Sequence, residues 1–93
     1  AFAVYEKEGY SKLHFHEERT EIYYIISGTA TVIVDGEEQQ LKQGQEITIY
    51  PNQQHQVISS GEEQLKMIVK CTPAWDAADQ HFITFSAMSN LVC

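Results

Sequence analysis

The chain carries four residues of the types that bind transition metals. His14 and His16 are separated by one residue, and Glu21 follows five positions later. His55 lies far downstream. Side chains alternate between the two faces of an extended strand, so His14 and His16 are expected to share a face. Imidazole and carboxylate groups suit divalent ions such as Fe, Mn, Ni, Cu or Zn. These four side chains are therefore a candidate ligand set for one such ion.

A set of three histidines and one glutamate leaves room for chemistry. On a six-coordinate ion it leaves two positions for water or substrate, which metal-ion catalysis requires. Taken singly, each residue also fits another role, because an isolated histidine is more often a surface or core residue. Glu21 in turn ends a charged stretch, residues 17–21. The elements that bring the four together must therefore be considered.

Short extended stretches separated by turns predict an all-β fold. β-Branched and aromatic runs, such as residues 22–26 and 29–34, are favourable in strands. Asp35-Gly36 is the strongest hairpin signal, because both residues tolerate the positive φ of a type I′ turn. The expected strands are residues 1–6, 10–16, 22–26, 29–34, 37–41, 46–50, 53–59, 64–72 and 80–85, with one helical turn within 74–79. This pattern predicts an antiparallel β-sandwich or barrel in a single domain, residues 1–93.

The composition is that of a folded, acidic chain. Its 93 residues are 43% hydrophobic and carry a formal net charge of −7, with six Lys and Arg residues in total. Scattered cations argue against nucleic acid or an anionic membrane as a partner. No apolar run approaches the ~20 residues of a membrane span. Cys71 and Cys93 do not form a disulfide framework, so Cys71 is expected to be a small buried residue in a cytoplasmic protein.

Two motifs make the chain resemble the cupin family. The family's first motif is G-x5-H-x-H-x3,4-E-x6-G, and the sequence matches it with one residue fewer after the first glycine. The matching residues are Gly9, His14, His16, Glu21 and Gly28. The second motif is G-x5-P-x-G-x2-H-x3-N, and its places are held by Gly44, Tyr50, Asn52, His55 and Ser59. Tyr50, Asn52 and Ser59 depart from the family residues, although asparagine still permits left-handed backbone.

The resemblance implies a fold and a metal site. The fold is the double-stranded β-helix of the cupin or jelly-roll type, with motifs at about residues 9–28 and 44–59. The implied ligands of one divalent transition metal are His14, His16, Glu21 and His55. Cupins include dioxygenases, isomerases, lyases and cyclases, so the resemblance does not choose a reaction.

Alternation along the strands suggests the rest of the pocket. Tyr23 shares the face of Glu21 and is the candidate catalytic residue, because its hydroxyl can donate to a metal-bound oxygen or act as acid or base if its pKa is lowered. The alternative is a packed core aromatic. The other expected neighbours are Ile25, Val57, Ser59 and Lys12. Residues that could line the mouth are Tyr50, Met67 and Phe85, whereas His81 is expected to lie outside.

Two expected strands, residues 22–26 and 30–34, are apolar on both faces. Antiparallel sheets usually leave one face in water, so these outer faces are expected to be covered. We predict a homodimer whose interface covers them. The alternative is cover by the chain's own termini.

The sequence thus predicts a small metal-dependent enzyme that acts on a small, oxygen-bearing substrate at a three-His, one-Glu ion. A phosphorylated substrate is disfavoured, because few cations are predicted inside and phosphate usually recruits Arg or several Lys residues. The alternative function is a non-enzymatic module that binds or senses a small ligand.

Overall fold

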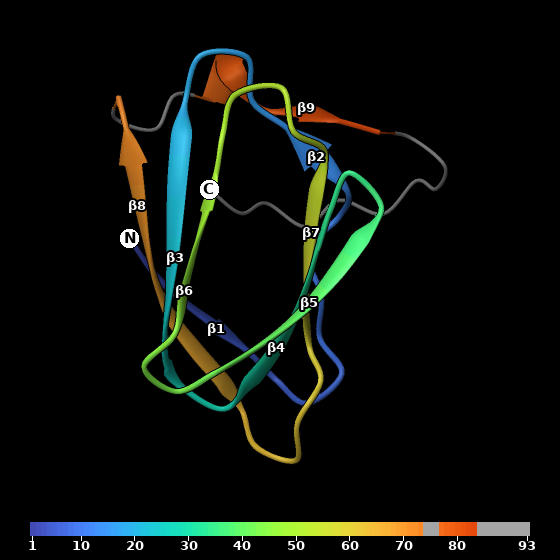
Figure 1. The fold of residues 1–93 in the computed structure, drawn as a ribbon, viewed down its shortest axis with the longest axis vertical. Helices are drawn as coiled ribbons and strands as arrows, with labels where there is room; N and C mark the ends of the chain where they lie inside the picture. Colours follow the sequence, from blue (N-terminus) through green and yellow to red (C-terminus); the bar gives the residue numbers. More distant parts are fainter. Residues whose placement is uncertain (74–76, 84–93) are drawn as a thin grey trace.

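The computed structural model describes residues 1–73 and 77–83, which form two antiparallel sheets (Figure 1). The first sheet has the strand order β1 (Phe2–Tyr5), β8 (Leu65–Thr72), β3 (Thr20–Ser27) and β6 (Glu46–Ile49). The second has the order β5 (Glu37–Lys42), β4 (Thr29–Val34), β7 (His55–Ser59), β2 (His14–Phe15) and β9 (His81–Phe82). One short 3-10 turn, η1 (Ala77–Asp79), precedes β9. The predicted all-β architecture is confirmed.

The hydrophobic core lies between the inner faces of the two sheets. Strand alternation sends Tyr23 and Ile25 of β3 inward and leaves Tyr24 exposed. The buried core residues are Tyr23, Ile25, Ala30, Val32, Val34, Leu41, Ile49, Val57, Leu65, Met67 and Val69. Among the described residues, no helix is long and apolar enough to cross a membrane.

The predicted strand at residues 10–16 is largely irregular, because only His14–Phe15 forms a strand. Tyr10 makes a single bridge to Ile58. The Ser11 hydroxyl accepts the N–H of Val57 at 2.9 Å, so a side chain occupies a donor that a backbone ladder would use. The last predicted strand is also shorter, at His81–Phe82, and residues 84–85 lie outside the described residues. The helical turn is described over residues 77–79.

Two turns adopt the left-handed backbone that their residues permit. Asp35 and Gly36 have φ angles of 49° and 86°, as a type I′ turn requires, and Val34 pairs with Glu37 across the hairpin. Asn52, which stands at the glycine place of the second cupin motif, has a φ of 70°. The replacement therefore keeps the backbone geometry that glycine usually supplies.

Gly28 carries the chain from β3 in the first sheet directly into β4 in the second. Its φ is +86°, and a Cβ at this position would lie 2.6 Å from the carbonyl oxygen of Gln64. A side chain is therefore disfavoured by the backbone conformation and would also collide with the backbone of Gln64, directly before β8. This crossing fixes how the two sheets face each other.

We expect Gly28→Ala to destabilise the protein by more than about 2 kcal/mol, because left-handed strain adds to the backbone clash. The matched control is Gly44→Ala, where φ is +88° but no atom lies within 4 Å of the added Cβ. That control should lose only about 1 kcal/mol. Denaturant midpoints of the metal-free proteins measure both. Equal losses in the two variants would contradict the role assigned to the crossing.

Candidate metal centre

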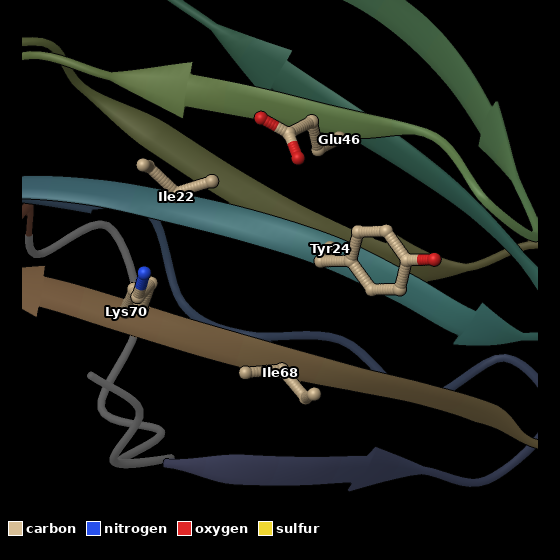
Figure 2. Close-up of a pocket in the computed structure, with 5 residues that line it drawn as sticks. All are labelled: Ile22, Tyr24, Glu46, Ile68 and Lys70. Carbon is tan, nitrogen blue, oxygen red and sulfur yellow. The ribbon is translucent and has the colours of Figure 1, made fainter.

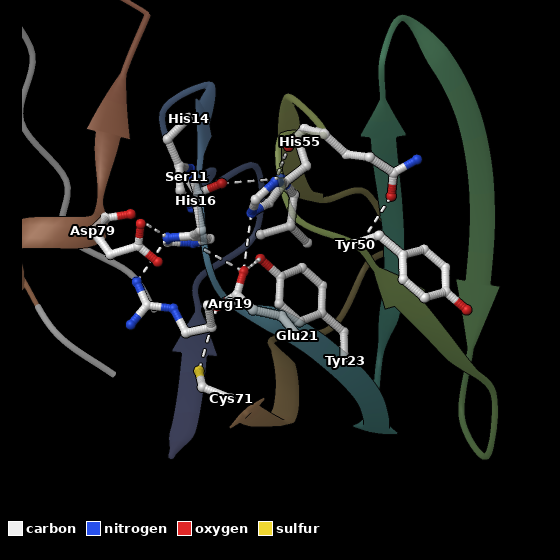
Figure 3. A network of polar contacts seen from close by, with 12 residues as sticks. Ser11, His14, His16, Arg19, Glu21, Tyr23, Tyr50, His55, Cys71 and Asp79 are labelled. Atoms are coloured by element: carbon white, nitrogen blue, oxygen red, sulfur yellow. Dashed lines mark hydrogen bonds and ion pairs between the residues drawn. The ribbon is translucent and has the colours of Figure 1, made fainter. Parts of the chain in front are cut away.

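Both sheets contribute to a group of three histidines and one glutamate. His14 in β2 lies opposite His55 in β7, and His16 follows directly after β2. Glu21 comes from β3 of the other sheet. The four side chains are at most 2% exposed, and one ligand atom from each lies within 4.8 Å of the others. Figure 3 shows the side chains converging between the strands. The structure thus brings all four predicted residues into one buried group that could hold a metal ion.

Each histidine ring is oriented by a backbone carbonyl. The Nδ1 atom lies 2.7 Å from Lys12 O in His14 and 2.9 Å from Gln53 O in His55. In His16 the same atom lies 3.0 Å from Asp79 O. A carbonyl oxygen can only accept, so each contact favours a proton on Nδ1 and a lone pair on Nε2. This second layer of contacts is typical of metal-binding histidines.

The Nε2 atoms meet a carboxylate oxygen across a short gap. Oε1 of Glu21 lies 3.1 Å from His16 Nε2 and 3.0 Å from His55 Nε2. With the ring proton on Nδ1, a lone pair of each ring faces the lone pairs of Oε1. A proton or a metal cation must therefore sit between them.

The distances fit a cation. Two ligand atoms that each lie about 2.1 Å from one ion, at right angles, are about 3.0 Å apart. His14 supplies a further Nε2 that is buried without a hydrogen-bond partner among the described residues. A buried polar atom without a partner is costly, and a bound metal ion would satisfy it. The donor set therefore fits a divalent transition metal.

The electrostatics of the group keep Glu21 charged and His14 neutral. Burial acts to raise the pKa of Glu21, but hydrogen bonds from His16 and His55 outweigh it and lower the pKa to about 2. Burial, followed by the neighbouring His55, lowers the pKa of His14 to about 4. A charged carboxylate and a neutral imidazole are the forms that bind metal.

Tyr23 lies next to the group, with its hydroxyl 3.4 Å from Glu21 Oε1, to which it donates. Burial and then the negative charge of Glu21 raise the pKa of Tyr23 well above its ordinary value. The condition for a base role, a lowered pKa, is therefore not met, and the hydroxyl remains a hydrogen-bond donor. Tyr5 in β1 is a further buried hydroxyl, and burial followed by Glu21 raises its pKa to about 12.

Arg19 was not among the predicted site residues, because in the sequence it stands as one more charge in the stretch of residues 17–21. It is 1% exposed, and its Nη2 lies 2.7 Å from Nδ1 of His16. An Arg donor and the Asp79 carbonyl call for opposite tautomers of that ring. Metal binding through Nε2 needs the proton on Nδ1, so Arg19 must then yield this nitrogen to Asp79 O. The charge run alone gave no sign of this burial.

Asp79 ties η1 to the loop between β2 and β3. Its carboxylate accepts the backbone N–H of Glu17 at 2.8 Å and of Glu18 at 3.2 Å. Burial acts to raise the pKa of Asp79, but these two donors outweigh it and lower the pKa. His81 lies outside the three-His, one-Glu group, as expected, with its Nε2 2.8 Å from Glu17 Oε1.

The other predicted pocket residues fall into three groups. Those buried as expected are Ile25, Val57, Ser59 and Lys12, whose Nζ lies 5.5 Å from the centre of the Phe82 ring. Of the residues expected to line the mouth, Met67 is a core residue, Tyr50 is 60% exposed and Phe85 lies outside the described residues. Cys71 was expected to be a small buried residue outside any disulfide framework, but it is half-buried and disulfide-bonded, with Sγ 3.5 Å from Glu21 Oε2.

Comparison with known proteins supports the interpretation of fold and motifs. The model of the cupin domain family matches residues 1–71. The chain belongs to the cupin family. A relative, an uncharacterized protein of Methanocaldococcus jannaschii, is 31% identical over 71 residues, which are 76% of this chain and 57% of that protein. This cupin therefore spans little more than half the length of that relative.

Solved structures share the cupin fold. A cupin 2 conserved barrel domain protein from Salinispora arenicola is 28% identical, with a TM-score of 0.69 over 83% of this chain and 61% of that one. A predicted oxalate decarboxylase from Thermotoga maritima is 23% identical, with a TM-score of 0.73 over 75% and 61% of the two chains. At that identity the second likeness shows the fold alone.

We expect the metal-free cupin to lose stability as the pH falls from about 6.5 to about 4. Unfolded His14 takes up a proton with its usual pKa near 6.5, whereas folded His14 resists until about pH 4. The loss should be on the order of 3 kcal/mol. Glu21 adds a further loss between about pH 4.5 and 2, because its folded pKa is also lowered. Urea midpoints in chelator measure both, and His14→Gln should flatten the upper range. An unchanged slope in that variant would refute the assignment.

Proposed function

We propose that this cupin is a metal-dependent enzyme that acts on a small, oxygen-bearing molecule. The observation that carries the proposal is a buried group of three imidazoles and one carboxylate. In it, two Nε2 atoms lie about 3 Å from Glu21 Oε1, and every Nδ1 lies near a backbone carbonyl. Without a cation between the ligands, such an arrangement stabilises the protein poorly, because lone pairs of the imidazole nitrogens face those of the carboxylate oxygen. It therefore supports metal binding as the purpose of the group.

Four residues would hold the ion and Tyr23 would serve the substrate. A divalent ion bound by His14, His16, Glu21 and His55 would supply Lewis-acid stabilisation of negative charge on a substrate oxygen, or redox chemistry if it is iron, manganese or copper. Glu21 contributes one negative charge, since its pKa is held near 2. The Tyr23 hydroxyl stays protonated and lies beside the ligand oxygen. This supports a role in which the hydroxyl turns from Glu21 to donate its hydrogen bond to negative charge that develops on the substrate.

The surroundings favour a small substrate. Tyr23, Ile25 and Val57 are buried and form an apolar wall beside the group. Lys12 is buried at 9% exposure. Apolar surroundings with few polar contacts suit a molecule of a few carbon and oxygen atoms. Oxalate, the substrate named for the predicted oxalate decarboxylase from Thermotoga maritima, is a molecule of that size.

Burial favours a second candidate function, a module that holds metal or a ligand without turnover. His14, Glu21 and His55 are each 0% exposed, and the ring of Phe82 lies 5.9 Å from that of His14. A substrate can reach the ion only if neighbouring segments move. A structural or sensing site needs no such motion, so metal binding without measurable turnover would favour this alternative.

We expect the purified protein to contain about one divalent transition-metal ion per chain. His14→Ala and His55→Ala should each reduce this content at least tenfold, because each removes one ligand of a buried ion. His81→Ala is the matched control and should keep the metal, since His81 pairs with Glu17 instead. Elemental analysis measures the content, and circular dichroism confirms folding. Metal retained in both ligand variants would show that the ligand set is wrong.

We expect Tyr23→Phe to keep the metal and to lower kcat at least tenfold on whichever substrate is turned over. Oxygen uptake and product formation with catechol-like, keto-acid, dicarboxylate and sugar substrates give the readout. Tyr24→Phe is the control, because Tyr24 lies on the opposite face of the same strand. An unchanged rate in Tyr23→Phe would contradict the catalytic role and leave Tyr23 as a packed core residue.

A further inference from the structure

Two groups of opposite hydrogen-bonding character contact the same nitrogen of His16. Its Nδ1 lies 2.7 Å from Nη2 of Arg19 and 3.0 Å from the backbone oxygen of Asp79. A guanidinium can only donate and a carbonyl oxygen can only accept, so the nitrogen cannot serve both at once. Among the described residues, Nδ1 of His14 and of His55 has a carbonyl contact without such a competing donor. His16 therefore differs from both.

Each position of the ring proton satisfies a different pair of partners. With the proton on Nε2, His16 donates to Oε1 of Glu21 at 3.1 Å, and its Nδ1 accepts from Arg19. With the proton on Nδ1, the ring donates to the Asp79 carbonyl and Nε2 presents a lone pair that can bind a metal ion. The exchange moves one proton between the two nitrogens and leaves the ring neutral. The first arrangement is complete without metal, whereas the second needs a cation between Nε2 and Glu21.

The two competitors at His16 are held close to its ring. Arg19 is 1% exposed, so its guanidinium has no easy path into water. The carboxylate of Asp79 accepts the backbone N–H of Glu17 at 2.8 Å and of Glu18 at 3.2 Å, which holds η1 against the loop that carries Arg19. Figure 3 shows both competitors beside His16. A hydrogen bond from a charged donor is stronger than one between neutral groups, so giving up the Arg19 contact has a substantial cost.

We propose that Arg19 weakens metal binding by donating to the outer nitrogen of His16, and that Asp79 strengthens it by accepting from the same nitrogen. Binding then exchanges the partner of His16 from the guanidinium to the carbonyl. Arg19 and Asp79 are thus positioning residues that act on the metal through His16. The inference rests on the proposed function only in its ligand set, because it concerns affinity and requires no turnover.

The ring nitrogens of the wild-type protein report this exchange without any substitution. Zn²⁺ is the probe, because it is diamagnetic and suits imidazole and carboxylate ligands. In chelator, nitrogen-15 NMR of the ring should show His16 protonated on Nε2 and His14 protonated on Nδ1. After Zn²⁺ is added, both rings should carry the proton on Nδ1. A His16 ring that already carries its proton on Nδ1 in chelator would overturn the proposal.

Variants of the two competitors should change Zn²⁺ affinity in opposite directions. Arg19→Met removes the donors but keeps a long side chain, and it should tighten binding at least tenfold. Arg19→Lys keeps a charged donor and should stay within about threefold of the wild type. Asp79→Ala releases the carboxylate that holds η1 and should weaken binding at least tenfold. Competition with a chelator of known affinity measures all three. A general loss of packing would weaken binding in every variant.

Lys70→Met is the matched control for the loss of one positive charge. Lys70 is exposed on the outer face of the first sheet, where Figure 2 shows it across β3 from Glu46. Solvent and salt screen a charge at this place, so Zn²⁺ affinity should stay within about twofold of the wild type. Equal tightening in Lys70→Met and Arg19→Met would mean that net charge sets the affinity, and would overturn the proposal.

Two outcomes separate this inference from the proposed function. Equal Zn²⁺ affinity in the wild type and in folded Arg19→Met would overturn the inference and leave the metal site intact. No Zn²⁺ bound by either protein would overturn both. Circular dichroism establishes whether each variant folds. If Arg19→Met does not fold, the nitrogen spectra of the wild type decide the role of Arg19 by themselves.

Discussion

The structure depends on one buried carboxylate. Glu21 is fully buried in β3, where a charge without compensation would cost several kcal/mol. His16 and His55 compensate it at 3.1 and 3.0 Å, and their contacts hold its pKa near 2 despite burial. The histidines in turn have carbonyl acceptors on their other nitrogens. A positive species between carboxylate and imidazoles is therefore required, and this links the electrostatics of the core to metal binding.

This constraint explains why the two sheets meet as they do. Glu21 belongs to the first sheet, whereas His14 and His55 pair with each other in the second. Gly28 lets β3 pass directly into β4 and so brings the two inner faces together. Asp79 holds the loop that leads from His16 to β3. Small shifts of the backbone at Gly28, or of the loop held by Asp79, would separate ligand atoms that lie about 3 Å apart.

The same strand alternation connects the buried group with the outer surface. In β3, the odd-numbered positions Glu21, Tyr23 and Ile25 face the core. Ile22 and Tyr24 therefore face outward, next to Ile68. Apolar residues on both faces of one strand were visible in the sequence, and a half-solvated sheet does not require them. One strand thus supplies a metal-ligand candidate to the interior and the centre of an apolar patch to the surface.

The sequence by itself determined the features that depend on local spacing. Alternation placed His14 and His16 on one side, the Asp35-Gly36 pair specified its turn, and the two motifs identified the four-residue group. Only the tertiary structure decided the rest. It buried Arg19 against His16, brought Asp79 to the loop, and shortened the strand that ends at His16. These outcomes involve residues far apart in sequence, or competition between a side chain and the backbone for one donor. Neither leaves a periodic signal, because such contacts are set by how the sheets pack rather than by the residues next to them in the chain.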